Sequence, residues 1–285
     1  MTRFRTGWDL TKKSWRLLRE RPGLASYPVA GALLALLPAI ALIAPGIYLF
    51  DTGDQVPGVA LAAVGLYLAS LAAIFFGVAL AAAADRAFRG EEVSLGTGVA
   101  VARSRVGAIA GWALVSTIVS LLMSLLESQR GLAGPIVAVL GGAAWGLITF
   151  LAIPVIAFEG TGPFATIRRS ASLFRHRWRG QVMGNVAIGG AVVLFGILPS
   201  IALIAVGGYM WVSDGNGAEL AAGAVVLLAG VLLLIVSSVI SQALRHVFGV
   251  ALYRYTSDGE VVAGFTEQEL ASAVRTRGGK HAATA

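Results

Sequence analysis

The 285-residue sequence lacks cysteine and has few charged residues. Without cysteine the chain has no disulfide framework and no thiolate for a metal site. Charged residues make up 13% of the chain, against about 25% in soluble domains, which is too few to cover a water-facing surface. Hydrophobic residues make up 57%, which excludes a disordered chain. These features leave an integral membrane protein.

Six stretches without any ionisable residue are long enough to cross a membrane. A helix rises about 1.5 Å per residue, so about 20 apolar residues span a bilayer core of about 30 Å. The stretches do not alternate polar and apolar residues as transmembrane strands do. We therefore expect an all-α, polytopic membrane helix bundle that forms a single membrane domain over residues 1–285. The predicted spans are approximately 24–50, 55–84, 106–126, 131–158, 180–213 and 220–244.

Four of the prolines inside these stretches predict kinks, because proline removes a backbone donor and neighbouring helices can satisfy the freed carbonyl. They are Pro38, Pro45, Pro154 and Pro199. Six full spans is the simpler interpretation, but Pro199 could also divide the fifth stretch into two half-helices.

The basic residues lie in alternate connecting segments. Of the 22 lysines and arginines, 21 lie before the first span, between spans two and three, between spans four and five, or after span six; the other is Arg130. The positive-inside rule assigns the 21 to the cytoplasm. The sequence therefore predicts a multi-pass protein of the cell inner (plasma) membrane with both termini cytoplasmic. The whole chain has a net charge of +7, and the side predicted to be cytoplasmic carries 21 basic and 10 acidic residues. This excess of positive charge faces anionic lipids of the inner leaflet, and we expect no binding of nucleic acid.

Amphipathic segments are predicted on this cytoplasmic side, at residues 1–23 and before the fifth span. Before the fifth span, Phe164, Ile167, Ala171, Phe174 and Trp178 form one apolar helical face. Such helices lie in the membrane interface with basic residues toward the headgroups. They could be topological anchors only, or they could bind anionic lipid or a protein partner. The candidate contacts are Arg168, Arg169, Arg175, Arg177, Lys12, Lys13 and Arg16.

The basic segments also carry a repeated pattern. An Arg-x-Arg motif precedes each odd-numbered span, which leaves open whether the chain contains three repeated helical hairpins. After the sixth span, residues 245–285 are predicted to form a cytoplasmic tail. Thr266 and Glu269 form a capping box, so a short helix is expected from residue 266, with Phe265 and Leu270 at the staple positions.

Several short motifs resemble an uncharacterised family of six-pass prokaryotic membrane proteins. The motifs are Gly7-Trp8-Asp9-Leu10-Thr11-Lys12-Lys13-Ser14-Trp15; Pro154 to Glu159 with Gly162-Pro163-Phe164-Ala165 and Arg169-Ser170; Trp178-Arg179-Gly180; and Leu252-Tyr253-Arg254-Tyr255 with Gly259 and Phe265. The chain is also more distantly similar to the membrane domain found beside glycerophosphodiester phosphodiesterases, although no segment could hold that catalytic domain. The resemblance implies a topology, with no activity and no site residues.

The sequence offers little for catalysis. No predicted span contains an ionisable residue, which is the usual mark of a proton relay or ion path. The three histidines are scattered and no Gly-x-x-x-x-Gly-Lys motif is present, so we expect no metal, no cofactor and no enzymatic activity. Glu159 is expected to form a structural ion pair with Arg168 or Arg169. Two glycine pairs, Gly107/Gly111 and Gly142/Gly146, predict close helix packing within the bundle or in a homo-oligomer.

The predicted function is a non-enzymatic membrane scaffold or accessory subunit whose basic cytoplasmic face binds anionic lipid or a partner. The alternative is a transporter of a lipid or small apolar solute, which would need a cavity lined by spans four and five, including Asn185. An enzyme acting on lipid headgroups ranks third. It would require Glu159 or the acids between Asp85 and Glu92 to converge on one pocket.

Overall fold

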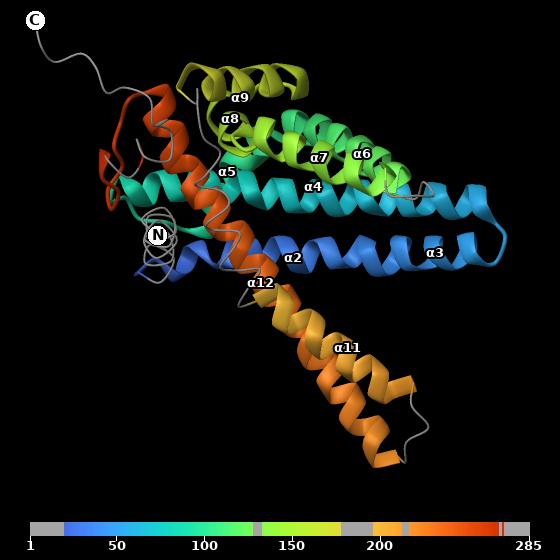
Figure 1. Cartoon of the computed structure of the whole chain (residues 1–285). Helices are drawn as coiled ribbons and strands as arrows, with labels where there is room; N and C mark the ends of the chain where they lie inside the picture. The colour runs from blue at the N-terminus through green and yellow to red at the C-terminus, as the bar shows by residue number, and fades with distance from the viewer. Residues whose placement is uncertain (1–19, 128–132, 178–195, 213–216, 268–269, 271–285) are drawn as a thin grey trace, which may run out of the picture. The chain divides into compact units, whose positions relative to one another are not determined.

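The computed structural model describes residues 20–127, 133–177, 196–212, 217–267 and 270 (Figure 1). Within these ranges every regular element is a helix, which confirms the all-α prediction. Contacts divide the chain into two compact units, one formed by residues 17–182 and 246–285 and the other by residues 1–16 and 183–245. Each unit is described by itself, and the single-domain organisation stays a prediction.

Four apolar helices in the described part of the chain are long enough to cross a membrane. The first runs continuously over Ser26–Asp51 as α2 (Ser26–Pro38), the π-helical η2 (Ala39–Ile43) and α3 (Ala44–Asp51); the others are α4 (Gln55–Phe88), α6 (Val106–Glu127) and α12 (Gly217–Ser257). Their length and composition define a multi-pass membrane protein. They begin within three residues of predicted spans one, two, three and six.

The remaining helices are shorter. They are η1 (Pro22–Leu24), α5 (Leu95–Ser104), α7 (Ala133–Ile148), α8 (Ala152–Glu159), α9 (Pro163–Arg177) and α11 (Leu198–Val212). Near the carboxyl end, Glu267 and Leu270 are helical, and the amide of Leu270 donates to the carbonyl of Thr266 at 3.1 Å. This is the first turn of the helix expected from residue 266, whereas Glu269 lies outside the described residues.

The structure does not show six full spans. The predicted fourth span, 131–158, is interrupted at residues 149–151, between α7 and α8. Pro154 explains the break: it has no amide hydrogen, and its ring would clash with the carbonyl of Phe150 in a regular helix. Of the predicted fifth span, residues 180–195 lie outside the description, and helical residues continue on both sides of Pro199.

Two helices extend past the apolar stretches that predicted them. α4 ends at Phe88 rather than near residue 84, and α12 ends at Ser257 rather than near residue 244. The added turns contain charged residues, among them Asp85 and Arg254. Ion pairs within the helices and between neighbouring helices, described below, hold Asp85 and Arg254 in these turns. The length of an apolar run therefore underestimates the length of a helix whose last turns are charged but packed against the protein.

α4 is the central helix of the larger unit and packs against α2, α5, α6 and α8 (Figure 1). Residues 77–85 of α4 are all buried. Most of them are alanine, and a helix that is apolar on every side is typical of a buried position. The small side chains let the neighbouring helices approach closely. This arrangement brings the charged ends of several helices to the carboxyl end of α4.

Glycines allow the closest contacts between helices, but most of these glycines are not the ones that the sequence predicted. A Cβ atom added to Gly58 would lie 2.6 Å from the amide nitrogen of Phe50, so α3 and α4 approach at backbone distance. In the smaller unit, a Cβ on Gly207 of α11 would lie 2.7 Å from Cα of Leu227 of α12. By contrast, no described atom lies within 4 Å of a Cβ built on Gly107, Gly142 or Gly146, and Gly111 contacts Pro163.

Candidate functional site

Segments far apart in the sequence meet at one end of the larger unit. Nη1 of Arg21 donates to the carbonyl of Glu91 at 3.0 Å. The hydroxyl of Tyr27 donates to the carbonyl of Ser94 at 2.7 Å and accepts from the amide of Gly98 at 3.3 Å. The segment just before the first span and the start of that span therefore contact the connection between the second and third spans. These are two of the basic segments that the sequence placed on one side of the membrane.

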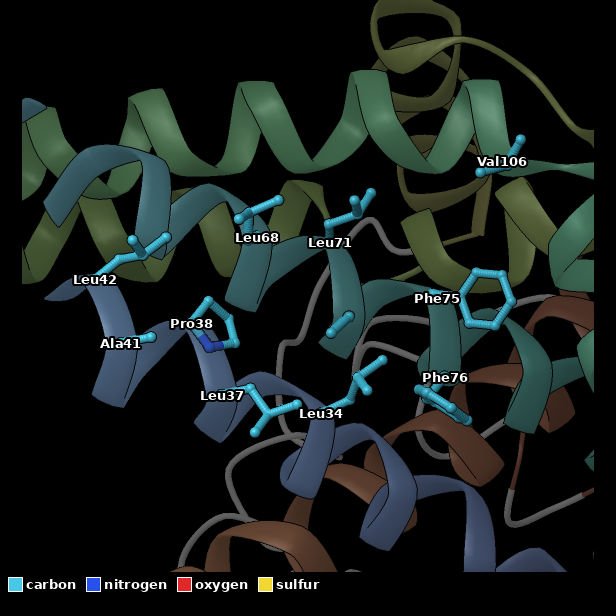
Figure 2. Close-up of a pocket in the computed structure, with 11 residues that line it drawn as sticks. Leu34, Leu37, Pro38, Ala41, Leu42, Leu68, Leu71, Phe75, Phe76 and Val106 are labelled. Atoms are coloured by element: carbon cyan, nitrogen blue, oxygen red, sulfur yellow. The ribbon is translucent and has the colours of Figure 1, made fainter. Parts of the chain in front are cut away.

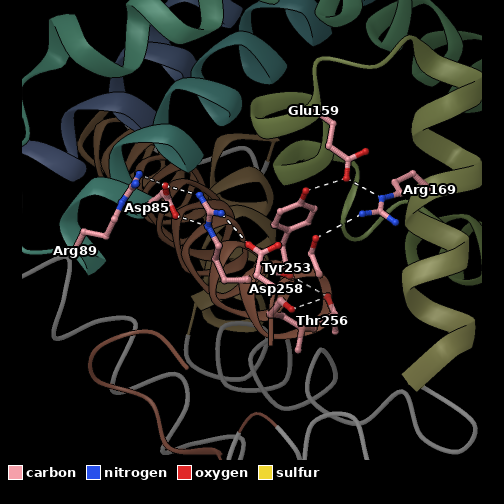
Figure 3. Close-up of polar contacts among 10 residues, drawn as sticks. Asp85, Arg89, Glu159, Arg169, Tyr253, Thr256 and Asp258 are labelled. Atoms are coloured by element: carbon pink, nitrogen blue, oxygen red, sulfur yellow. Dashed lines mark hydrogen bonds and ion pairs between the residues drawn. The ribbon is translucent and has the colours of Figure 1, made fainter. Parts of the chain in front are cut away.

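The same end of the unit holds a network of ionic and hydrogen-bonding side chains, which we call the polar cluster (Figure 3). It joins the carboxyl ends of α4, α8 and α12 with α9. Its members are Asp85, Arg89, Glu159, Arg169, Tyr253, Arg254, Ser257 and Asp258.

Asp85 and Arg254 form the most buried part of the polar cluster. Nε of Arg254 donates to Oδ1 of Asp85 at 2.7 Å, and Nη2 donates to Oδ2 at 2.8 Å. The side chains are only 6% and 22% exposed, respectively. Arg89, one turn after Asp85, also binds Oδ2, and Asp258, one turn after Arg254, accepts from Nη1 at 2.8 Å. A bidentate arginine–carboxylate pair fixes both distance and orientation, so it fastens α12 to α4.

Glu159 forms the second part of the polar cluster. Its Oε1 accepts from Nε of Arg169 at 2.7 Å and from the hydroxyl of Tyr253 at 2.8 Å. Nη2 of Arg169 in turn donates to Oγ of Ser257 at 3.5 Å. The predicted ion pair of Glu159 with a neighbouring arginine is confirmed, and Arg169 is the partner. The hydrogen bond to Glu159 raises the pKa of Arg169, and partial burial opposes the increase, so this arginine stays charged at any physiological pH.

An aromatic contact connects the two parts of the polar cluster. The Arg254 guanidinium carbon lies 4.6 Å from the centre of the Phe158 ring, within the range of a cation–π interaction. The Phe158 ring in turn lies 5.2 Å from the Tyr253 ring, measured between centroids. Because both carboxylates accept hydrogen bonds from arginine, the geometry is that of a structural connection between four helices. Among the described residues, no group of three or more His, Cys, Asp or Glu side chains is placed to hold a metal ion.

α9 presents two distinct faces. Thr166, Ser170 and Leu173 are buried, and the Ser170 hydroxyl donates to the carbonyl of Ile148 at 2.5 Å. Phe164, 76% exposed, and Arg168, also exposed, lie one turn apart on the outside. Two hydroxyl-bearing residues and a leucine therefore attach α9 to the protein, while an aromatic and a basic side chain face outward.

The structure places the predicted contact residues in different settings. Arg168 is exposed, whereas Arg169 belongs to the polar cluster. Arg175 and Arg177 lie in the last turn of α9, and their side chains fall outside the description. The candidates Lys12, Lys13 and Arg16, and the predicted interfacial residue Trp178, also fall outside it. So does Asn185, and with it the predicted transporter cavity.

Sequence reasoning missed the Asp85–Arg254 pair. Asp85 was noted only as one of several acids near the end of span two, and Arg254 only as part of a short motif. A usable signal existed: Asp85 with Arg89, and Arg254 with Asp258, are opposite charges at i and i+4, a spacing that supports continued helix. The pairing between α4 and α12 joins residues 169 positions apart, which no local pattern indicates.

The long apolar helices with charged residues gathered at one end define a multi-pass membrane protein. The chain belongs to the family described as "Family of unknown function (DUF6159)", whose model matches residues 59–265. The matched range contains every member of the polar cluster. No curated protein and no solved structure matches the chain. The more distant similarity to the membrane domain beside phosphodiesterases therefore stays a prediction.

Proposed function

We propose that this protein is a non-enzymatic membrane scaffold or accessory subunit whose basic face binds the headgroups of anionic lipids. One observation carries the proposal: α9 directs Phe164 and Arg168 outward, one turn apart, while its opposite face is buried in the protein. A helix in the membrane interface places aromatic rings at the acyl boundary and arginines toward the headgroups. The exposed face of α9 has that composition.

The polar cluster supports this function by fixing the position of α9. Arg169 binds Glu159 at the end of α8 and Ser257 at the end of α12. Arg168, the next residue, points away from these contacts because successive residues on a helix lie about 100° apart. Because the backbone of α9 is already fixed, binding of a phosphate by Arg168 requires no ordering of the helix, which favours binding. The proposal includes six spans, an inner-membrane location and cytoplasmic termini, as the charge distribution of the sequence predicts.

The test is lipid binding by the full-length protein in detergent, with Arg168→Gln compared with the unchanged chain. The protein is titrated with short-chain phosphatidylglycerol or phosphatidylcholine, and binding is measured as the increase in its unfolding temperature. The titration gives an apparent affinity for each lipid. We expect Arg168→Gln to weaken binding of phosphatidylglycerol about fivefold, the effect of one arginine at an anionic surface. Binding of phosphatidylcholine should not change.

Arg130→Gln is the matched control, because Arg130 is the one basic residue in the predicted outer connections. It should leave both affinities unchanged. Equal affinity of the Arg168→Gln variant and the unchanged protein for phosphatidylglycerol would contradict the proposed function.

A further inference from the structure

An apolar groove of about 650 Å³ lies between the first and second membrane helices and the start of α6 (Figure 2). All of its lining side chains are apolar. Representative lining residues are Leu37, Pro38 and Ala41 from the first helix, Leu71 and Phe75 from α4, and Val106, the first residue of α6.

The groove coincides with an irregular part of the first helix. Pro38 ends α2, and the next five residues form the π-helical η2. Single π-helical turns inside α-helices often occur at functional sites. On each side of the groove the two helices touch closely: a Cβ on Gly31 would lie 2.9 Å from Cβ of Phe76, and a Cβ on Gly65 would lie 2.8 Å from Cγ1 of Ile43, the last residue of η2. Because the helices are in close contact at both ends of the groove, the groove is a fixed feature of their packing.

The position of the groove determines what can fill it. Its walls belong to Ser26–Asp51 and α4, two of the helices long enough to span a membrane. Leu37 and Ala41 are exposed, so the groove opens toward the hydrocarbon. A polar ligand would lose its hydrogen bonds to water there without replacement. A hydrocarbon chain is the chemistry that fits.

Positive charge lies at the Val106 end of the groove. Arg103 is exposed and forms no ion pair with any described residue, and Nε of Arg105 is buried without an acceptor in the described part of the chain. Arg103 lies three positions before Val106 in the sequence, so their Cα atoms are at most about 11 Å apart. Arg105 itself lies against Gly160, at the turn between α8 and α9. Arg103 is therefore the better placed residue for a ligand at the groove, and both arginines make this end positive.

We propose that the groove binds one acyl chain of an anionic glycerophospholipid whose headgroup phosphate contacts Arg103. This inference rests on the proposed function, because it takes the basic end of the helices as the side that meets anionic lipid. It adds a defined site on the first helical hairpin, separate from α9. The apolar walls select a chain, and the unpaired arginine selects a negative headgroup over a zwitterionic one.

The test uses the full-length protein in phosphatidylcholine vesicles that contain a small share of a photoactivatable lipid with a diazirine in the chain. The lipid is phosphatidylglycerol in one series and phosphatidylcholine in the other, and adducts are located by peptide mass spectrometry. We expect phosphatidylglycerol adducts to concentrate in residues 34–42 and 68–76. Arg103→Gln should reduce these adducts about fivefold.

Two variants fill the groove from exposed positions: Ala41→Phe and Leu37→Trp. Each should remove most adducts from residues 34–42 and 68–76 and leave adducts on α12 unchanged. Ala143→Phe, at an exposed position of α7 away from the groove, is the matched control and should change nothing. Uniform labelling of all membrane helices, equal labelling by both lipids, or labelling that Ala41→Phe and Leu37→Trp leave intact would overturn the proposal.

The groove and the proposed function fail in different experiments. Groove adducts that require Arg103 would support lipid binding in the groove whatever the effect of Arg168→Gln. If Arg168→Gln had no effect on the affinity for phosphatidylglycerol, only the proposed role of α9 would be contradicted. A fivefold effect of Arg168→Gln together with uniform photolabelling would contradict the groove only.

Discussion

Arg254 of α12 binds Asp85 of α4 through two parallel hydrogen bonds of 2.7 and 2.8 Å, although the two residues are 169 positions apart in the sequence. Asp85 is nearly buried and also binds Arg89. Because the pair lies where both helices end, it fixes their relative position at the basic end of the unit.

Asp85→Asn should destabilise the protein by about 3 kcal/mol, the lower end of the range for breaking a buried ion pair. The nearly buried Arg254 then keeps only Asp258, a half-exposed residue, as its acidic partner. The measurement is unfolding of the detergent-solubilised protein, followed by tryptophan fluorescence. In a double-mutant cycle with Arg254→Gln, the combined loss should be clearly smaller than the sum of the single losses.

Glu91→Gln is the control for Asp85→Asn. Glu91 pairs with Arg86 and Arg89 at 3.9 and 3.5 Å, and all three side chains are 41–53% exposed. Such surface pairs contribute about 1 kcal/mol or less. Similar losses for Asp85→Asn and Glu91→Gln would show that the Asp85 pair does not hold the helices together.

Gly98→Ala should destabilise the protein by about 1–3 kcal/mol, the usual cost of overpacking. A Cβ there would meet the carbonyl oxygen of Ala79, a backbone atom that cannot rotate away, and would lie 2.6 Å from the Tyr27 hydroxyl. At Gly142, no described atom lies within 4 Å of an added Cβ. Gly142→Ala should therefore leave the stability unchanged or increase it by up to about 1 kcal/mol, because alanine has a higher helix propensity than glycine. Thermal unfolding of both variants compares the two positions, and an equal response would refute the close approach of α5 to α4.

Tyr253→Phe should cost about 1 kcal/mol, the net value of one hydrogen bond. It removes the hydroxyl that donates to Glu159 and leaves the ring beside Phe158 and the Arg169–Glu159 pair in place. Tyr48→Phe, at a residue that is 68% exposed, should have no measurable effect on unfolding. If Tyr253→Phe were also without effect, Tyr253 would not contribute to the stability of the polar cluster.

Single cysteines test the topology directly, since the natural chain has none. Asp54→Cys should react with a membrane-impermeant maleimide in intact cells. Glu260→Cys, at an exposed residue beyond α12, should react only after the membrane is permeabilised. Labelling of both positions in intact cells, or the reverse pattern, would contradict the predicted orientation.

Much of the candidate site was visible in the sequence as separate pieces. The charge pattern grouped Arg21, Glu159, Arg169 and Arg254 on the predicted cytoplasmic side, and it indicated an ion pair of Glu159 with either Arg168 or Arg169. The pattern could not show that Asp85 pairs with Arg254, because partner choice depends on which helix ends meet in space. It also could not show that Arg169 is used internally while its neighbour Arg168 faces outward, because that depends on the rotation of α9 against α8.

Sequence alone therefore determined the all-helical class, four of the membrane helices and the separation of charge along the chain. These properties are local: a backbone in hydrocarbon must satisfy its own hydrogen bonds, and charged residues are costly there. The true ends of α4 and α12, the polar cluster and the groove beside η2 were decided by tertiary structure. Each depends on atoms from separate helices meeting, which hydropathy along a single chain does not record.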